Sequence, residues 1–318
     1  MSHLCELLKK ELAIVDYLIL FFAVLCIAIQ FNLNKFYQKK FADGLKDILF
    51  FPLVSGIVNF ALFILISLGI YGKLPDFSVF SFIMAISLAI VSTLSALVGI
   101  LVMKYGKMSV YSVFMMLGGM ILPYFYGLIF LDETISIARI AGVVILICAL
   151  PCSAVDPKNK EKAVSVKSYY ILCVFIFILN GIVSILSKAH SVNISAIPAA
   201  NFIVFTNIWG TVINGGLYFI FAPRFTQQKD REVSNEVNPN KFHAVLVITI
   251  YAVFSGVGFL LLLISAKTVP AVAMYPFITG GSIVLSTVLA RIFYKEKIGR
   301  LATTGIIMSM AGTLLFLI

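Results

Sequence analysis

The sequence IFLDETISIARIAG, residues 129–142, is echoed further along the chain by IFYKEKIGRLATTG, residues 292–305. The two stretches are 163 residues apart, which is about half of the chain. The same register runs back without a gap to the pairs Gly118/Gly281, Phe114/Phe277 and Lys104/Lys267, and forward to Glu133/Glu296 and Gly142/Gly305. In each copy an apolar run ends, a short polar turn carries a glutamate, and a second apolar run begins. An echo at a fixed offset indicates duplication, so we expect two copies of one structural unit.

The composition is that of a membrane protein. Hydrophobic residues make up 61% of the chain, charged residues only 12%, and the mean hydropathy is +1.06. A soluble domain carries about 25% charged residues, so most helices here must face lipid rather than water. The fold class that we predict is therefore an all-α membrane protein.

The net charge of +10 does not indicate a nucleic-acid partner, because the basic residues are scattered over short loops and form no continuous stripe. The sequence also lacks the closely spaced cysteine and histidine ligands of a metal or haem site, so we expect no metal and no cofactor. The residues in question are Cys5, Cys26, Cys148, Cys152, Cys173, His3, His190 and His243.

Ten apolar runs are long enough to cross the hydrocarbon core as helices, which needs about 20 residues. The expected spans are 14–34, 48–71, 79–103, 107–131, 135–153, 169–188, 199–222, 243–266, 270–293 and 300–318. The first run resembles a signal peptide, but it is too long and lacks a small-residue cleavage site, so we interpret it as a retained helix. We expect a first five-helix repeat over 1–153, a polar linker over 154–168 and a second repeat over 169–318.

Five spans per repeat is an odd number, so the second copy enters the membrane from the opposite side. The echo thus predicts inverted repeats related by a pseudo-two-fold axis in the membrane plane. Basic residues agree: eighteen follow the odd-numbered spans and six lie on the other side. The positive-inside rule would place the eighteen in the cytoplasm and both termini outside.

No Asp, Glu, Lys or Arg lies in the middle of an expected span, which argues against a buried proton relay. Uncharged polar residues are the better candidates for a substrate cavity, because in lipid they face the bundle interior, where they bond helix to helix or line water. The candidates are Gln30, Asn32, Ser92, Ser95, Tyr111, Asn180, Ser184, Asn207, Trp209, Tyr251, Tyr275 and Thr279.

Glu133 and Glu296 each stand at the expected start of a helix, where a carboxylate caps free N–H groups and opposes the helix dipole. The alternative is a salt bridge that gates the cavity, for instance between Glu133 and Arg139. Glycines at matching places in the two copies indicate either hinges in broken helices or close helix packing. They are Gly118, Gly119, Gly142, Gly280, Gly281 and Gly305, with Pro123 and Pro276 one turn from the paired glycines.

Two five-helix halves, each closing with F-x-x-E-x-I and a glycine nine residues after the glutamate, resemble the drug/metabolite transporter superfamily, EamA type. The resemblance covers about 14–318 and rests on Glu133 with Gly142 and Glu296 with Gly305. It implies ten helices around a central cavity that opens alternately to each side. It also implies a basic residue at the end of the first helix of each half, here Lys35 and Lys188, and cytoplasmic termini, which is the opposite of the charge count.

We therefore expect a multi-pass integral protein of a bacterial inner membrane, a monomer or homodimer, whose partners are membrane lipids and a small-molecule substrate. It would be a secondary transporter for a small polar metabolite such as an amino acid, a sugar or a nucleoside. The alternative is an exporter of aromatic or cationic drug-like compounds, which aromatic side chains bind by stacking and cation–π contact. A membrane-embedded enzyme or a channel would need converging acid–base groups or a charged filter, which the sequence does not offer.

Overall fold

The computed structural model describes residues 2–41, 45–105, 108–154, 167–229, 241–294 and 299–316, and these form helices joined by short connections without a strand. The helices are α1 (Ser2–Lys40), α2 (Leu45–Tyr71), α3 (Val79–Tyr105), α4 (Met108–Phe130), α5 (Ile137–Ala154), α6 (Lys167–Val192), α7 (Ala199–Lys229), α8 (Lys241–Thr268), α9 (Ala271–Tyr294) and α10 (Arg300–Leu314). The expected all-α architecture is confirmed.

Eight of these helices are long and apolar enough to cross a membrane. The other two, α5 and α10, carry shorter apolar segments, Ile137–Cys152 and Thr303–Leu314. Large apolar side chains lie exposed along the spanning helices, among them Leu65, Phe219 and Ile292. Exposed apolar side chains are unfavourable in water and favourable against lipid, so these helices cross a membrane and the protein is a multi-pass membrane protein.

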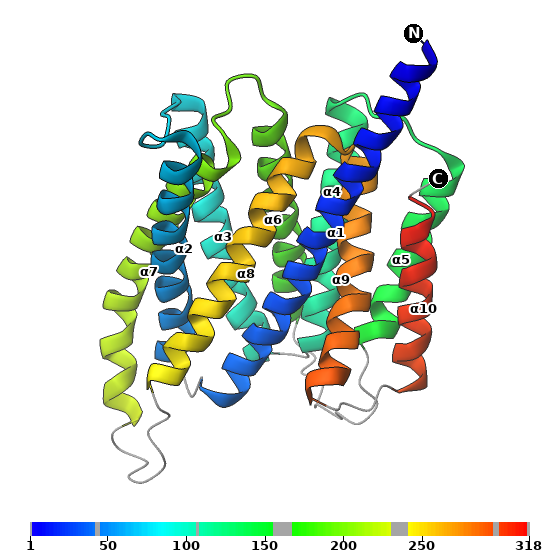
Figure 1. Ribbon diagram of the computed structural model, residues 1–318. Helices are drawn as coiled ribbons and strands as arrows, with labels where there is room; N and C mark the ends of the chain where they lie inside the picture. Colours follow the sequence, from blue (N-terminus) through cyan, green and yellow to red (C-terminus); the bar gives the residue numbers. More distant parts are fainter. Residues whose placement is uncertain are drawn as a thin grey trace.

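Eight helices pack in a closed ring, in the order α1, α8, α2, α7, α3, α6, α4, α9 and back to α1. Outside the ring, α5 and α10 pack on each other and against α4 and α9, and Figure 1 shows this pair at one side of the bundle. Among the described residues, the main contact between opposite helices of the ring is that of α6 with α8. The ring therefore encloses a space that is bridged at one level.

Successive helices run in alternating directions, so the start of α1 and the end of α10 lie toward the same end of the bundle (Figure 1). We call this the terminal end. The α2–α3, α4–α5, α6–α7 and α8–α9 connections also lie there, while α1 ends and α2 begins at the opposite end (Figure 1). Those of the eighteen counted basic residues that the structure describes lie in helix turns toward this opposite end, such as Lys39 in the last turn of α1 and Lys241 at the start of α8.

The paired glycines lie at close helix crossings. A Cβ on Gly118 would clash with the backbone of Phe177 in α6, and one on Gly281 would come within 2.9 Å of Val24 in α1. Both α4 and α9 run unbroken through their glycines and prolines. Between the two interpretations of these glycines, the geometry favours close packing over broken helices.

Three more of the predicted glycines, Gly119, Gly142 and Gly280, follow the same pattern. A Cβ on Gly119 would lie 2.6 Å from the side chain of Asn180, and one on Gly142 would lie 2.9 Å from the carbonyl oxygen of Gly312 in α10. At Gly280 a Cβ would clash with Thr313, also in α10. Gly305 is buried in α10.

Candidate functional site

A cavity of about 560 Å³ lies inside the ring and is lined by seven of its eight helices, all except α4. We call it the central cavity. None of the described residues that line it carries a charge. Its polar groups are side-chain amides and hydroxyls, and its apolar surface includes Phe259, Leu88 and the rings of two tyrosines.

The structure places seven predicted residues on this cavity: Gln30, Ser92, Asn180, Ser184, Asn207, Tyr251 and Tyr275. Tyr111 lines a smaller pocket of about 240 Å³ between the last turns of α1 and the first turns of α2. This vestibule shares Pro52, Ser55, Asn214 and Tyr251 with the central cavity, so it extends the cavity toward the end of the bundle opposite the termini.

Four predicted residues line neither space. Asn32 is buried between helices, where its amide donates to the carbonyl oxygens of Ala28 and, in α9, Ser286. Trp209 packs edge-on against Phe82 with ring centroids 5.6 Å apart. The other two are Ser95, which is half-buried, and Thr279, which is 7% exposed. Asn32 and Trp209 are therefore helix-packing positions in this structure.

The sequence interpretation missed several lining residues, namely Ser55, Asn59, Ser187 and Thr206. A signal for some of them was present, because Asn180, Ser184 and Ser187 follow the i, i+4, i+7 spacing of a single helix face. Ser55 and Asn59 in α2 are likewise four residues apart and line the cavity together.

At the terminal end, the turn between α8 and α9 leaves helix-end backbone groups without helical partners, as every helix terminus does. The chain reverses over Thr268, Val269 and Pro270. The N–H groups of Ala273 and Met274 donate to the Pro270 carbonyl, so the N–H groups of Ala271 and Val272 remain open. In a buried site each such group must find another acceptor.

The Glu133 carboxylate supplies both acceptors. Oε1 accepts from the Ala271 N–H at 2.7 Å and Oε2 from the Val272 N–H at 2.8 Å. Glu133 reaches them from the α4–α5 connection, where Asp132 adopts a left-handed φ of 50° that ends α4. Gly127 makes room for the approach, since a Cβ there would lie 2.5 Å from Glu133 Oε2.

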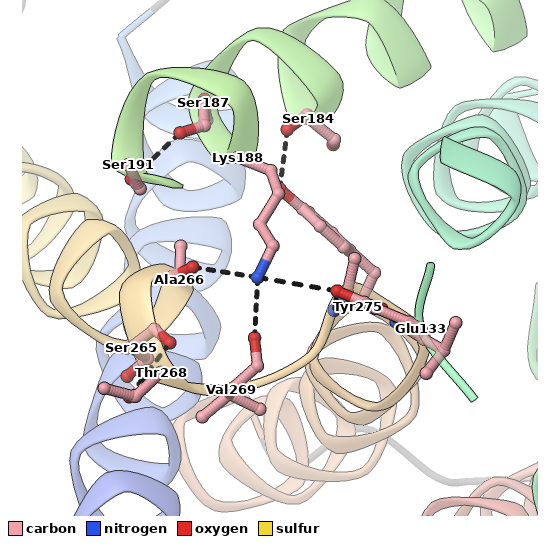
Figure 2. A network of polar contacts seen from close by, with 12 residues as sticks. Glu133, Ser184, Ser187, Lys188, Ser191, Ser265, Ala266, Thr268, Val269 and Tyr275 are labelled. Atoms are coloured by element: carbon pink, nitrogen blue, oxygen red, sulfur yellow. Dashed lines mark hydrogen bonds and ion pairs between the residues drawn. The ribbon is translucent and has the colours of Figure 1, made fainter. Parts of the chain in front are cut away.

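Lys188 caps the other side of the same turn. Its ammonium donates to the carbonyl oxygens of Ala266 at 2.8 Å and Val269 at 2.7 Å, and it lies 3.9 Å from Glu133 Oε1 (Figure 2). The Lys188 side chain is 3% exposed and that of Glu133 is 11% exposed. We call Glu133, Lys188 and the α8–α9 turn that they cap the clasp.

The clasp forms the contact that crosses the ring and packs the terminal end shut. The first residues of α9, Ala271–Met274, are 0% exposed around it. One turn into α9, the Tyr275 hydroxyl donates to the Ser184 carbonyl oxygen at 2.6 Å and ties α9 to α6 (Figure 2). A solute in the central cavity therefore meets α6 and α9 directly below a closed end.

This geometry corrects two expectations about Glu133. It does not cap α5, because that helix begins at Ile137 and its side-chain cap is Ser136, whose hydroxyl accepts from the Arg139 N–H at 3.2 Å. Nor does Glu133 pair with Arg139, whose guanidinium donates to the Thr134 carbonyl oxygen at 3.3 Å. Its ionic partner is Lys188. Glu296 lies outside the residues that the structure describes.

No protein-family model matches this chain, and no curated protein matches it. Among solved structures, one described only as a crystal structure of a protein aligns with 95% of this chain and 96% of its own, at a TM-score of 0.73. The two sequences are 13% identical, so the likeness concerns the fold alone.

Proposed function

We propose that this protein is a secondary transporter that carries a small polar metabolite across the membrane by alternating access. The observation that carries the proposal is the central cavity, which is lined by uncharged polar groups, extends toward one end of the bundle and is closed at the other by the clasp. Alternating access requires such a pair of ends around one site, of which one is closed at a time.

The packing of the ring supports an inverted repeat of two five-helix halves. If α1–α5 correspond to α6–α10, the α1–α8 contact corresponds to α6–α3 and the α4–α6 contact to α9–α1. Exchanging the two halves leaves the α2–α7, α4–α9 and α5–α10 pairs unchanged, because each pair joins a helix to its own counterpart. In transporters built this way the substrate site lies between the repeats, near the membrane centre.

With ten membrane spans and repeats over 1–153 and 169–318, the protein would be an EamA-type member of the drug/metabolite transporter superfamily in a bacterial inner membrane. Support for this assignment comes from the closing motif of each half and from the ring around a cavity. The charge-free lining disfavours a solute with an exposed anionic group such as a phosphate, because that group would be buried without a cationic partner, which is costly.

Uptake into proteoliposomes tests the proposal. Purified protein would be reconstituted and supplied with labelled amino acids, sugars, nucleosides and small amines, with and without a pH gradient. We expect protein-dependent flux of at least one class, and Asn180→Leu should reduce it, because Asn180 lines the cavity on α6. Flux that is equal in protein-free liposomes for every class would refute transport.

A further inference from the structure

The α6 wall of the central cavity presents mainly hydrogen-bond acceptors. The Asn180 amide nitrogen donates to the Met115 carbonyl oxygen at 2.7 Å, and this contact fixes which end of the amide faces α4. The Ser184 and Ser187 hydroxyls donate to carbonyl oxygens of their own helix, at 3.2 and 2.8 Å. A hydroxyl has one proton and two lone pairs, so both serines are left as acceptors.

The α7 wall repeats this arrangement. The Asn207 amide nitrogen donates to the Ile203 carbonyl oxygen at 2.8 Å, and the Thr206 hydroxyl donates to the Phe202 carbonyl oxygen at 2.9 Å. Asn214 uses its nitrogen twice, toward the Gly210 carbonyl oxygen at 2.7 Å and the Thr93 hydroxyl at 3.4 Å. A backbone carbonyl only accepts, so each amide must turn its nitrogen to the helix and its oxygen away.

Taken together, the two walls offer six side-chain oxygens, from three amides and three hydroxyls, against two spare amide N–H groups on Asn180 and Asn207. On α2, which packs beside α7 in the ring, Asn59 turns its oxygen against Gly256, where it has no hydrogen-bond partner among the described residues. The Asn59 amide nitrogen is thereby left for the cavity. The lining is thus polarised, with acceptors on α6 and α7 and an amide donor on α2.

We propose that the α6–α7 wall is a subsite for the primary ammonium group of the substrate, and that the cavity selects amines whose other polar groups are uncharged. An ammonium group brings three donors and no acceptor, which matches this wall. The rings of Tyr251, Tyr275 and Phe259 on the same cavity favour a cation further. A carboxylate or phosphate finds no cationic side chain among the described lining residues.

The inference rests on the proposed function in taking the central cavity as the substrate site, and it narrows the substrate class to ammonium compounds. Its test is a binding screen that does not depend on transport. Purified protein in detergent would be heated with a panel of matched triplets, each an amino-acid amide, the free amino acid and the N-acetylated amide. We expect the thermal midpoint to rise with amides that keep a free ammonium group, and the acid and N-acetyl partners to bind at least tenfold more weakly.

Ser187 and Ser191 provide a matched pair of variants (Figure 2). Both are buried on α6, and both hydroxyls donate to the carbonyl four residues earlier, but only Ser187 lines the cavity. Ser187→Ala should weaken binding of the ammonium compounds about ten- to a hundredfold, as expected for one lost hydrogen bond to a charged group. Ser191→Ala should leave binding unchanged, while it should shift the thermal midpoint of unfolding as much as Ser187→Ala does. Asn207→Leu gives a second, independent loss of an acceptor on α7.

Preferential binding of acids or N-acetylated compounds, equal binding within the triplets, or the absence of any stabilising amine would overturn the ammonium subsite. These results leave transport to be judged separately by the uptake assay. Uptake of a sugar or an acid would uphold transport and refute the subsite. Amine binding that depends on Ser187, without uptake of the bound amine, would uphold the subsite and refute transport.

Discussion

Breaking the clasp should open the terminal end of the bundle. Lys188→Met removes both donors from the Ala266 and Val269 carbonyl oxygens and leaves Glu133 as a buried carboxylate without its cation. Removing one partner of a buried pair costs about 3–5 kcal/mol. If the clasp forms only while the terminal end is closed, a cost of about 3 kcal/mol shifts the balance between closed and open forms by roughly 100-fold.

The assay is labelling of one introduced cysteine from the terminal side. Thr206→Cys places the thiol on the cavity wall, in a background from which the five native cysteines have been removed. A membrane-impermeant maleimide added to oriented vesicles should react slowly with this protein. With Lys188→Met added, the rate should rise by about one to two orders of magnitude, because labelling follows the population of the open form.

Lys267→Met is the matched control, since Lys267 lies in the last turn of α8, next to the clasp, but is exposed. It should leave the labelling rate unchanged. Glu133→Gln combined with Lys188→Met removes both charges. The free-energy cost of the double substitution should therefore be about 1–3 kcal/mol smaller than the sum of the costs of the two single substitutions. An unchanged labelling rate in a well-folded Lys188→Met protein would refute the assignment of the clasp as a gate.

Two further predictions concern stability, each measured as the thermal midpoint of unfolding in detergent. Gly118→Ala should destabilise by about 1–3 kcal/mol, because the Cβ would meet the Phe177 backbone, which cannot yield as a side chain can. Gly216→Ala, with nothing within 4 Å, should stabilise by about 0.5–1 kcal/mol, and the same sign for both variants would contradict the packing argument. Ser67→Ala should cost about 1–3 kcal/mol, since the buried Asn201 oxygen loses its donor at 2.6 Å, and a midpoint equal to that of the unmodified protein would contradict this.

Hydropathy predicted the helices well, because each span must hold an apolar run within a narrow length range. The run at 79–103 became α3 (Val79–Tyr105). The prediction started the first helix at 14, whereas α1 begins at Ser2, and it ended the seventh helix at 222, whereas α7 continues to Lys229. Its last turns are polar, and hydropathy reports where lipid ends rather than where the helix ends.

The cavity was predictable only in part. Asn207 lines it, whereas Trp209, two residues along the same helix, packs against Phe82. Helical periodicity separates the faces of a helix but does not say which face meets a cavity and which meets a neighbour. The sequence pattern also failed to place Lys188 inside the bundle, because Lys188 stands near the end of its apolar run and was counted with the loops. Its spacing of four from Ser184 placed it on the cavity face of α6.

The clasp also explains how charged groups are accommodated in an apolar bundle. An isolated ammonium group and an isolated carboxylate would each be costly to bury there. Here each charged group caps a helix end of opposite partial charge. Lys188 caps the carbonyl end of α8 and Glu133 caps the N–H end of α9, where the helix dipoles favour these signs. Opening this end would uncover the charges and the helix termini together, so water would have to replace every one of these bonds.

Under the proposed transport function, that arrangement would link the clasp to the solute. Ser184 lines the cavity one turn before Lys188, and its carbonyl oxygen accepts from Tyr275, one turn after the N–H groups that Glu133 caps. A solute held against Ser184 and Tyr275 therefore acts on the same two helix segments that the clasp joins. Coupling requires only that the solute bind these segments with different affinity in the closed and open forms. Separating α6 from α9 would change the spacing of the two segments and would therefore change this affinity. An ammonium group that bridges α6 and α7 would hold α6 in place and favour the form with the clasp intact.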